Sequence, residues 1–317
     1  MKVNKPLVIF LLGPTASGKT NWAIHWHKTF PEIEIISVDS VMVYKGCNIG
    51  SAKPSIEVLT NHPHHLIDII TLSEIFSVSD FCQQANNLIS NIHKRKKIPL
   101  LVGGSMMYFN LLKNGINKLP SSNKNFRERL YARLNNEGIE KLYEELYEID
   151  KKAAIKIQKK DTQRIVRALE IAHFSRDKYK ENTKQSELEP LVNKYNLFEY
   201  GIFPTNRAEL HSRIEQRQHE LISGGLIDEA KSLIDKYNVP VEHPAMKAIN
   251  YRQALQVLNG KLKVENLFKK SLYATRQLAK RQFTWMRGWK NLNHFDLNDL
   301  DMATIQLKNQ LNLDKIV

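Results

Sequence analysis

The sequence of 317 residues contains only two cysteines, Cys47 and Cys82. Two isolated thiols give neither a disulfide framework nor the ligand spacing of a zinc site, and they fit a reducing cytoplasm. The sequence also lacks any apolar run near the roughly 20 residues that span a bilayer. Its first apolar run, Leu7–Leu12, leads into a glycine-rich loop, so we expect a strand there and not a signal peptide. We therefore predict a cytoplasmic protein without a membrane partner.

Acidic residues are scarce: 33 Asp and Glu stand against 47 Lys and Arg, which gives a formal net charge of +14. Residues 266–295 contain no acid at all. On a helix, spacings of 7, 4 and 7 bring Lys269, Arg276, Lys280 and Arg287 onto one side. Such aligned cations suit a nucleic-acid backbone, although a solvated surface stripe and a basic background that maintains solubility are the alternatives.

The first 120 residues alternate strand and helix signals. Buried strands are expected at Leu7–Leu12, Ile33–Val38 and Ile98–Val102, and Ser79 is expected to cap the helix before the third strand. Strands that alternate with helices predict an α/β fold whose parallel sheet has helices on both faces.

Residues 121–198 change in character, because they are rich in Lys, Glu, Asn and Tyr and follow helical periods. We interpret them as an all-helical insertion, with a loop at Ser175–Glu189. Residues 199–317 then return to the core, and residues 1–120 with 199–317 form one domain. In this part we expect a strand at Tyr200–Phe203.

A long helix should follow this strand, with Asn206 and Glu209 as its capping box and Gly224-Gly225 at its end. The tail after Asn291 looks peripheral. No further apolar stripe requires a partner, so we expect a monomer without an obligate protein partner.

Residues 13 to 20 read GPTASGKT, the pattern GxxxxGK[ST] between a strand and a helix. This predicts a P-loop NTPase-like core, in which the backbone N–H groups of the loop and the helix N-terminus hold a diphosphate. Lys19 would add a point charge, and the Thr20 hydroxyl would bind Mg²⁺ as a cofactor. The diphosphate-binding candidates are Gly13, Pro14, Thr15, Ala16, Ser17, Gly18, Lys19 and Thr20. A glycine-rich turn without a ligand is the alternative.

Such a loop usually accompanies a second strand that ends in a Mg²⁺-binding Asp. Here Ile98–Val102 is followed by Gly-Gly-Ser, and Asp39 is the carboxylate at an early strand end. This pattern weakens a nucleotidase but leaves a small-molecule kinase open. Asp39 and Ser105 should both lie beyond the carboxyl ends of their strands, beside the phosphate loop. Asp39 can act there as a general base, or it can be a structural cap or a ligand of Mg²⁺-bound water.

Arg217 falls inside the apolar stripe of the helix after Asn206. A guanidinium on a core-facing stripe needs an anion, which could be a carboxylate or a bound diphosphate. Near the other end of the chain, Phe283 flanks the basic helix face, whereas Trp285 and Trp289 are interpreted as core anchors. His62, His64 and His65 match no common zinc pattern, so we favour local structure over a metal site.

Taken together, these segments resemble the tRNA dimethylallyltransferase family, which prenylates an adenosine beside the anticodon. The resemblance runs from about Pro6 to Trp289. It is carried by GPTASGKT, DSVMVYKGCNIGSAKP, HHLIDI, VGGSMMY, DTQRIVRALE, RIEQR, HPAMKAINYRQAL and ATRQLAKRQFTWMR.

The resemblance implies dimethylallyl diphosphate as the donor and the anticodon arm of tRNA as the partner, with the insertion holding that arm. It further implies that the adenine at position 37 is flipped into a channel, where its N6 attacks the allylic carbon. Asp39 would be the base, Ser105 would lie near the leaving oxygen, and Arg217 would bind the diphosphate. The implied tRNA contacts are Asp39, Ser40, Val41, Met42, Ser105, Arg127, Gln163, Arg164, Ile165, Val166, Arg167, Lys247, Ala248, Ile249, Asn250, Tyr251, Arg252, Lys280, Arg281, Gln282, Phe283, Thr284, Trp285, Met286 and Arg287.

The sequence departs from the family pattern at a few positions. Met42 stands where the family usually has glutamine, Asn250 and Met106 replace usual glycines, and Ser105 replaces threonine but keeps the hydroxyl. Other functions therefore stay open: prenylation of free adenine nucleotides, phosphorylation of a small molecule with ATP, or RNA binding without catalysis.

Overall fold

The computed structural model describes residues 5–115, 120, 123–178 and 188–316. The chain divides into two compact units, which we call the core unit and the helical unit. The core unit combines residues 1–115 and 189–317, and the helical unit comprises residues 116–188. The helical unit thus ends earlier than the predicted insertion, 121–198, because the chain after residue 189 packs into the core unit.

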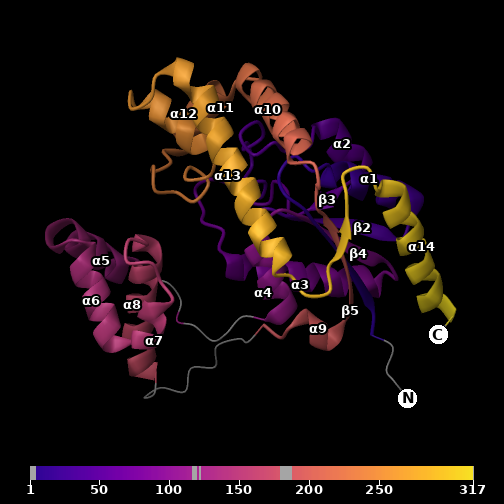
Figure 1. Ribbon diagram of the computed structural model, residues 1–317, viewed down its shortest axis with the longest axis horizontal. Helices are drawn as coiled ribbons and strands as arrows, with labels where there is room; N and C mark the ends of the chain where they lie inside the picture. Colours follow the sequence, from indigo (N-terminus) through magenta and orange to yellow (C-terminus); the bar gives the residue numbers. More distant parts are fainter. Residues whose placement is uncertain (1–4, 116–119, 121–122, 179–187, 317) are drawn as a thin grey trace. The chain divides into compact units, whose positions relative to one another are not determined.

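The core unit is built on a parallel sheet that has six strands among the described residues (Figure 1), in the order β3-β2-β4-β1-β5-β6. The strands are β1 (Leu7–Leu12), β2 (Ile33–Val38), β3 (His64–His65), β4 (Ile98–Gly103), β5 (Asn196–Ile202) and β6 (Asn293–Phe295). The predicted α/β fold is confirmed, and so are the three strands expected in the first 120 residues, which are β1, β2 and β4. β5, however, begins four residues before the predicted Tyr200.

Helices surround this sheet. In the core unit they are α1 (Lys19–Thr29), α2 (Ile56–Asn61), α3 (Val78–Lys94), α4 (Met106–Asn114), α9 (Leu191–Lys194), α10 (Arg207–Ser223), α11 (Leu226–Tyr237), α12 (Tyr251–Leu258), the 3-10 helix η1 (Val264–Asn266), α13 (Leu267–Arg287) and α14 (Leu300–Ile316).

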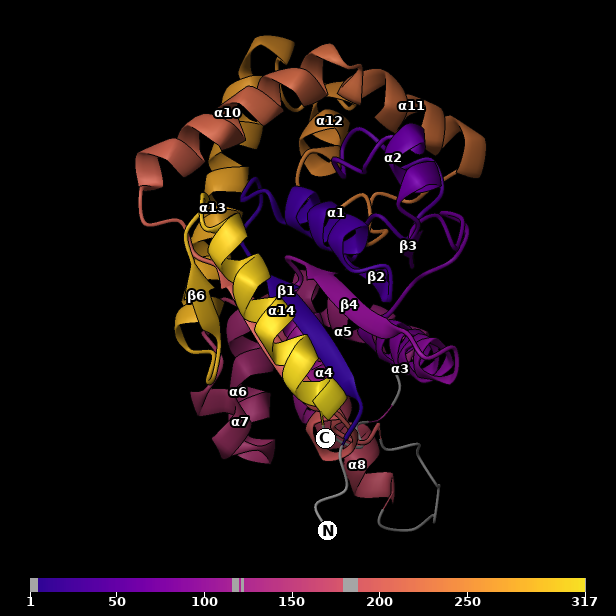
Figure 2. The ribbon, with the colours of Figure 1, turned by 90° about the vertical axis from the view of Figure 1, so that its right-hand side faces the viewer.

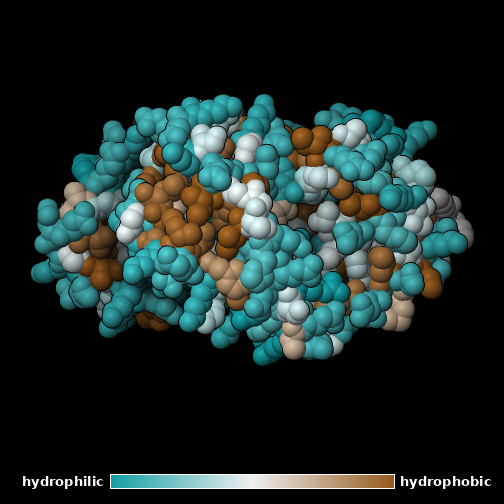
Figure 3. All heavy atoms as spheres, turned by 90° about the horizontal axis from the view of Figure 1, so that it is seen from above, coloured by the Kyte–Doolittle hydropathy of each residue, from teal (hydrophilic) through white to brown (hydrophobic). Residues whose placement is uncertain are grey.

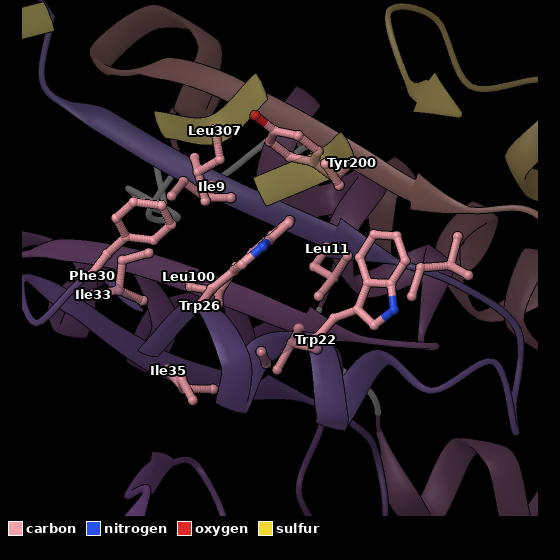
Figure 4. Packing of buried hydrophobic residues seen from close by; sticks show 14 of the residues in the cluster. Ile9, Leu11, Trp22, Trp26, Phe30, Ile33, Ile35, Leu100, Tyr200 and Leu307 are labelled. Carbon is pink, nitrogen blue, oxygen red and sulfur yellow. The ribbon is translucent and has the colours of Figure 1, made fainter. Parts of the chain in front are cut away.

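One face of the sheet is covered by α1 and α14 (Figure 2). Trp22 and Trp26 of α1 pack against β1 and β4, and Leu307 of α14 joins the same cluster (Figure 4). The tail after Asn291 is therefore not peripheral, because it supplies an edge strand and a core helix. The other face meets α4, where the rings of Phe10 and Phe109 lie 5.0 Å apart.

Two predicted helix caps differ in the structure. α3 is capped by Ser77, whose hydroxyl accepts the N–H of Asp80, rather than by Ser79. Asn206 does cap α10, but Glu209 does not complete the box: its carboxylate pairs with Arg213 at 2.8 Å. The helix ends at Gly224, as the Gly-Gly pair predicts.

The helical unit consists of α5 (Lys124–Glu137), α6 (Ile139–Ile149), α7 (Lys151–Ile155) and α8 (Thr162–Lys178). Leu142, Leu146 and Leu169 lie in its own small hydrophobic core. The predicted loop Ser175–Glu189 starts too early, because α8 continues to Lys178, and residues 179–187 lie outside the described residues.

The face in Figure 3 is mostly hydrophilic, and its hydrophobic residues gather in limited areas. Among the described residues, each helix is too short or too polar to cross a bilayer.

Candidate active site and RNA-binding surface

A cavity of about 650 Å³ lies in the core unit, beyond the carboxyl ends of β1, β2 and β4. This is the position where parallel α/β sheets bind their ligands. Residues from the loops after these strands line it, together with residues of α10 and α13 and of the segment before α12. The predicted site residues in its lining are Thr15, Ala16, Lys19, Thr20, Asp39, Ser40, Val41, Met42, Ser105, Arg217, Lys247, Ala248, Ile249, Asn250, Arg252, Arg281, Gln282 and Trp285.

The phosphate loop connects β1 to α1 at the floor of this cavity. Ala16 and Gly18 take positive φ angles of 61° and 81°, which turns the backbone tightly. A Cβ on Gly13 would lie 2.6 Å from the Ser17 hydroxyl, so a larger residue there would displace this side chain. Lys19 folds back and donates from Nζ to the carbonyl of Pro14 at 2.5 Å. The loop therefore has the compact turn of an anion-binding nest.

Asp39 follows β2 directly. Its Oδ1 accepts the backbone N–H groups of Val41 at 2.8 Å and Met42 at 3.1 Å. One carboxylate oxygen therefore orders the turn after β2, as the structural alternative expected. The carboxylate also lines the cavity, so its other oxygen is available for a ligand.

Two cations lie in the same cavity as Asp39. Burial, and secondly the charge of Arg217, lowers the pKa of Lys19 to about 7, while Asp39 acts in the opposite direction. Burial likewise lowers the pKa of Arg217, and Glu220 partly opposes this. Two half-buried cations with one carboxylate near them make a site suited to a multiply charged anion.

Ser105 lies at the N-cap of α4, and its hydroxyl makes no capping hydrogen bond. The glycines before it are required sterically, because a Cβ on Gly103 would lie 2.1 Å from the carbonyl of Val38. This close packing brings the loop after β4 beside the turn of Asp39. Ser105 and Asp39 thus line one cavity, as expected from their strand ends.

The candidate RNA contacts of the core unit fall into two groups. Lys247, Arg252 and Arg281 are exposed and line the cavity. Lys280, Thr284 and Arg287 are exposed on α13 but do not line it. By contrast, Tyr251, Phe283 and Met286 are buried, so their side chains support the surface and do not reach an RNA.

Three features of the basic helix face differ from the sequence-based interpretation. Arg276 is paired with Glu215 at 2.8 Å, so the aligned cations are reduced to Lys269, Lys280 and Arg287. Phe283 packs inward against Phe203, with ring centroids 5.0 Å apart. Trp285 is 44% exposed and is therefore not a core anchor.

In the helical unit, Arg127 and Arg167 both pair with the fully buried carboxylate of Glu170. Burial raises the pKa of Glu170, but the hydrogen bonds from these arginines outweigh it and keep the pKa below its usual value. Ile165 and Val166 are buried. Gln163 and Arg164 are exposed, and Arg164 lies 3.4 Å from Asp161. Of the residues in this group, Gln163 and Arg164 are the most accessible.

His62, His64 and His65 make local hydrogen bonds within the core unit. His65 pairs with Glu34 at 2.9 Å, and His64 hydrogen-bonds through Nδ1 to the carbonyl of His62. His64 also lines the cavity, which the sequence analysis did not expect.

Glu229 is a supporting residue that the sequence analysis missed. Its carboxylate accepts the N–H groups of Asn48, Ile49 and Gly50, and the hydroxyl of Tyr251 at 2.6 Å. It thereby holds the loop after β2 against α11 and α12. The sequence gives no signal for this role of Glu229, because its partners in the loop after β2 lie 179 to 181 positions away.

The fold and the cavity place this chain among the α/β proteins that have a parallel sheet, a GxxxxGK[ST] loop after β1 and, beyond the strand ends, a cavity lined by cations. The chain belongs to the IPP transferase family, whose model matches residues 42–289. It is therefore an enzyme of the transferase class.

Similar proteins and solved structures agree with this family assignment. A tRNA dimethylallyltransferase of Legionella pneumophila strain Corby is 42% identical over 298 residues, which cover 94% of each chain. The tRNA isopentenylpyrophosphate transferase of Bacillus halodurans superposes with a TM-score of 0.70 at 34% identity, and covers 98% of this chain and 97% of its own. The tRNA delta(2)-isopentenylpyrophosphate transferase of Staphylococcus epidermidis superposes with a TM-score of 0.67 at 31% identity. The match covers 97% of this chain and 99% of that chain.

Proposed function

We propose that this protein transfers the dimethylallyl group of dimethylallyl diphosphate to N6 of the adenosine at position 37, beside the anticodon of tRNA. It would act as a cytoplasmic monomer, with Mg²⁺ as its cofactor. The observation that carries the proposal is the shared cavity of Lys19, Arg217 and Asp39. This combination serves a reaction in which an anion leaves and a proton is removed.

The chemistry assigns one task to each group. N6 of adenine attacks the allylic carbon, the carbon–oxygen bond to diphosphate breaks, and Asp39 takes the proton that N6 loses. Lys19, Arg217 and the N–H groups of the phosphate loop meet the charge of the leaving diphosphate. The Ser105 hydroxyl can donate a hydrogen bond to the leaving oxygen. Apolar walls, among them Met42 and Met106, keep water from the reacting carbon.

The donor set also fits a magnesium ion. Thr20 offers a hydroxyl to the cavity, and Mg²⁺ prefers such oxygen ligands. Among the described residues no group of three or more His, Cys, Asp or Glu could hold a metal by itself. Bound Mg²⁺ would screen the diphosphate charge, and it would need phosphate oxygens and water to complete its coordination.

The exposed cations support RNA as the acceptor. Lys247, Arg252 and Arg281 line the cavity, and Lys280 and Arg287 extend the basic surface along α13. Cations at the mouth of a cavity position a phosphate backbone while a flipped base enters. An adenosine in a loop is suited to this, because flipping an unpaired base costs least.

The direct test is incubation of the protein with dimethylallyl diphosphate, Mg²⁺ and a tRNA that carries adenosine at position 37. Mass spectrometry of the digested RNA should show one added C5H8 group on that adenosine. Parallel reactions with AMP as acceptor, and with ATP as donor, test a free-nucleotide transferase and a kinase. Folded protein that leaves the tRNA unmodified would contradict the proposal.

A further inference from the structure

Gln218 lies on the face of α10 that packs into the core unit, at a position where helical spacing favours an apolar residue. Leu210 and Ile214 precede it on this face at intervals of four positions, and all three side chains are buried. Gln218 is 1% exposed and lines the active-site cavity. A buried amide therefore borders the site, and the proposed reaction gives it no role.

The amide nitrogen of Gln218 has no hydrogen-bond partner within the described part of the chain. Ile214 and Leu221, one turn away on either side along α10, also line the cavity and are apolar. Thr275 of α13 lines it too, but its hydroxyl donates to the carbonyl of Ser271 at 2.9 Å. Burial of an unbonded donor is unfavourable for folding, so we expect its partner to arrive with a ligand.

The part of α10 that carries Gln218 is directed toward the phosphate loop. Ile214, one turn earlier on the same face, belongs to a hydrophobic cluster shared with α13, and Ala16 of the loop packs against this cluster. Helices α10 and α13 lie side by side (Figure 1). Arg217, the residue before Gln218, lowers the pKa of Lys19 through its charge, so its guanidinium lies near the loop lysine. The ligand group expected beside Gln218 is therefore the diphosphate.

A neutral donor suits a diphosphate at this place. Diphosphate oxygens accept several hydrogen bonds, whereas a dimethylallyl tail accepts none. A third cation would further disfavour the charged form of Lys19, which burial and Arg217 already disfavour. An amide N–H adds a hydrogen bond to a phosphate oxygen and leaves the charge of the lysine unopposed.

We propose that Gln218 is a diphosphate-binding residue, whose Nε2 group donates a hydrogen bond to a diphosphate oxygen. The inference deepens the proposed function and rests on it, because it takes a prenyl diphosphate as the ligand of this cavity. Gln218 becomes a third side chain, with Lys19 and Arg217, that holds the leaving group. The ligand then supplies the partner that the buried amide lacks.

Gln218→Met tests the proposal, because it keeps the length of the side chain and removes the amide. Calorimetry measures the binding of pyrophosphate with Mg²⁺ present, and urea unfolding measures stability without a ligand. Pyrophosphate should bind about ten- to a hundredfold more weakly, as expected for the loss of one hydrogen bond to a charged partner. The urea midpoint should stay the same or rise, because an unbonded amide leaves the interior. A purely structural role would not separate binding from stability in this way.

Two further variants complete the test. Gln216→Met is the matched control, because Gln216 is exposed on the same helix and does not line the cavity. It should bind pyrophosphate like the wild type. Gln218→Glu keeps the size of the side chain but replaces the donor with a carboxylate, so it should weaken binding more than Gln218→Met does. An RNA hairpin of the anticodon arm should bind equally to the wild type and to Gln218→Met in anisotropy measurements.

The proposal is overturned by equal pyrophosphate affinity of the wild type and Gln218→Met, or by a wild type that does not bind pyrophosphate. It is also overturned if the unfolding midpoint of Gln218→Met falls together with its affinity, because the amide would then serve packing. Loss of hairpin binding with unchanged pyrophosphate binding would assign the amide to RNA instead. If Gln218→Met does not fold, Gln218→Glu decides, and wild-type affinity in that variant contradicts the assignment.

The prenylation assay separates this inference from the proposed function. A wild type that shows the expected dependence of pyrophosphate binding on Gln218 but never prenylates tRNA contradicts the proposed function and leaves the diphosphate contact standing. A wild type that prenylates tRNA, while Gln218→Met binds pyrophosphate equally well, leaves the proposed function standing and removes only this contact.

Discussion

The side-chain carbonyl of Gln282 accepts a hydrogen bond from the backbone N–H of Thr15 at 2.9 Å. The amide nitrogen of the same side chain donates to the carbonyl of Gly104 at 2.9 Å. A Cβ on Gly104 would lie 2.4 Å from that nitrogen, so the glycine permits the contact. One buried amide on α13 therefore ties the phosphate loop to the loop that carries Ser105.

Replacement of this amide should impair both turnover and folding. Gln282→Met keeps the length of the side chain but leaves the Thr15 N–H and the Gly104 carbonyl without partners, a loss of about 1 to 3 kcal/mol for each buried group. Because both loops face the diphosphate, we expect kcat to fall at least about tenfold. Steady-state kinetics and thermal unfolding of the variant measure the two effects.

Gln277→Met is the matched control, because Gln277 is exposed on the same helix. It should leave kcat unchanged. If Gln282→Met turned over like the wild type, the two loops would not depend on this amide for their catalytic geometry.

Asp39→Asn separates the base from the structural role of this residue. Asparagine keeps a carbonyl oxygen that can accept the N–H groups of Val41 and Met42, but it cannot take a proton. We expect the single-turnover rate of prenylation to fall by about 10²- to 10⁴-fold, as for the loss of a general base. Binding of tRNA, measured by anisotropy, should change little. Loss of binding together with the rate would assign Asp39 to RNA recognition instead.

Three strands of the sheet could be predicted from the sequence, because β1, β2 and β4 are short apolar runs that end at glycine or at a polar residue. The start of β5 was not predictable from the sequence, since Glu199 resembles an acidic residue of the surface. Its burial depends on Lys113, which lies 86 positions away. The phosphate loop has a local signature, and Asp39 follows a strand end. A local pattern thus predicted the centre of the site.

The parts that sequence could not predict depend on distant partners. Arg276 was assigned to the basic face because of its helical spacing, but it pairs with Glu215, 61 positions away. The sequence predicts Trp285 as a core anchor, yet this residue is 44% exposed and lines the active-site cavity. Helical spacing gives the direction of a side chain but not the identity of the element that packs against it.

We expect diphosphate binding to depend on pH through the lowered pKa of Lys19. With its pKa at about 7, free Lys19 is mostly neutral at pH 8, and a bound anion raises the pKa by favouring the ammonium. Binding therefore takes up a proton above pH 7, and affinity falls as the pH rises, toward about tenfold per pH unit. Calorimetry with pyrophosphate at pH 8, in two buffers of different ionisation enthalpy, measures the uptake. Lys19→Met should lose this component, and equal uptake by both proteins would contradict the assignment.

Arg217→Met should weaken pyrophosphate binding by about ten- to a hundredfold, because hydrogen bonds to a charged partner contribute about 1.5 to 3 kcal/mol. The change also removes a charge that lowers the pKa of Lys19, so this pKa should rise. Calorimetry and the pH profile of binding test both effects. Arg207→Met at the start of the same helix is the control, because Arg207 is exposed and does not line the cavity. Unchanged binding in Arg217→Met would remove Arg217 from the diphosphate site.

Asn250 stands where the family usually has glycine, and its surroundings explain why asparagine is accepted there. Its backbone has φ 75° and ψ −58°, close to the γ-turn conformation, which glycine adopts freely and which strains other residues. Its Nδ2 also donates to the carbonyl of Gly50 at 2.9 Å, a bond that glycine cannot make. Asn250→Ala should destabilise the fold by roughly 1 to 3 kcal/mol, because it combines a strained backbone with a lost hydrogen bond. Asn250→Gly should cost less, because it relieves the strain and loses only the bond. Urea unfolding of the two variants measures the difference, and a glycine variant less stable than the alanine variant would show that backbone strain does not govern this position.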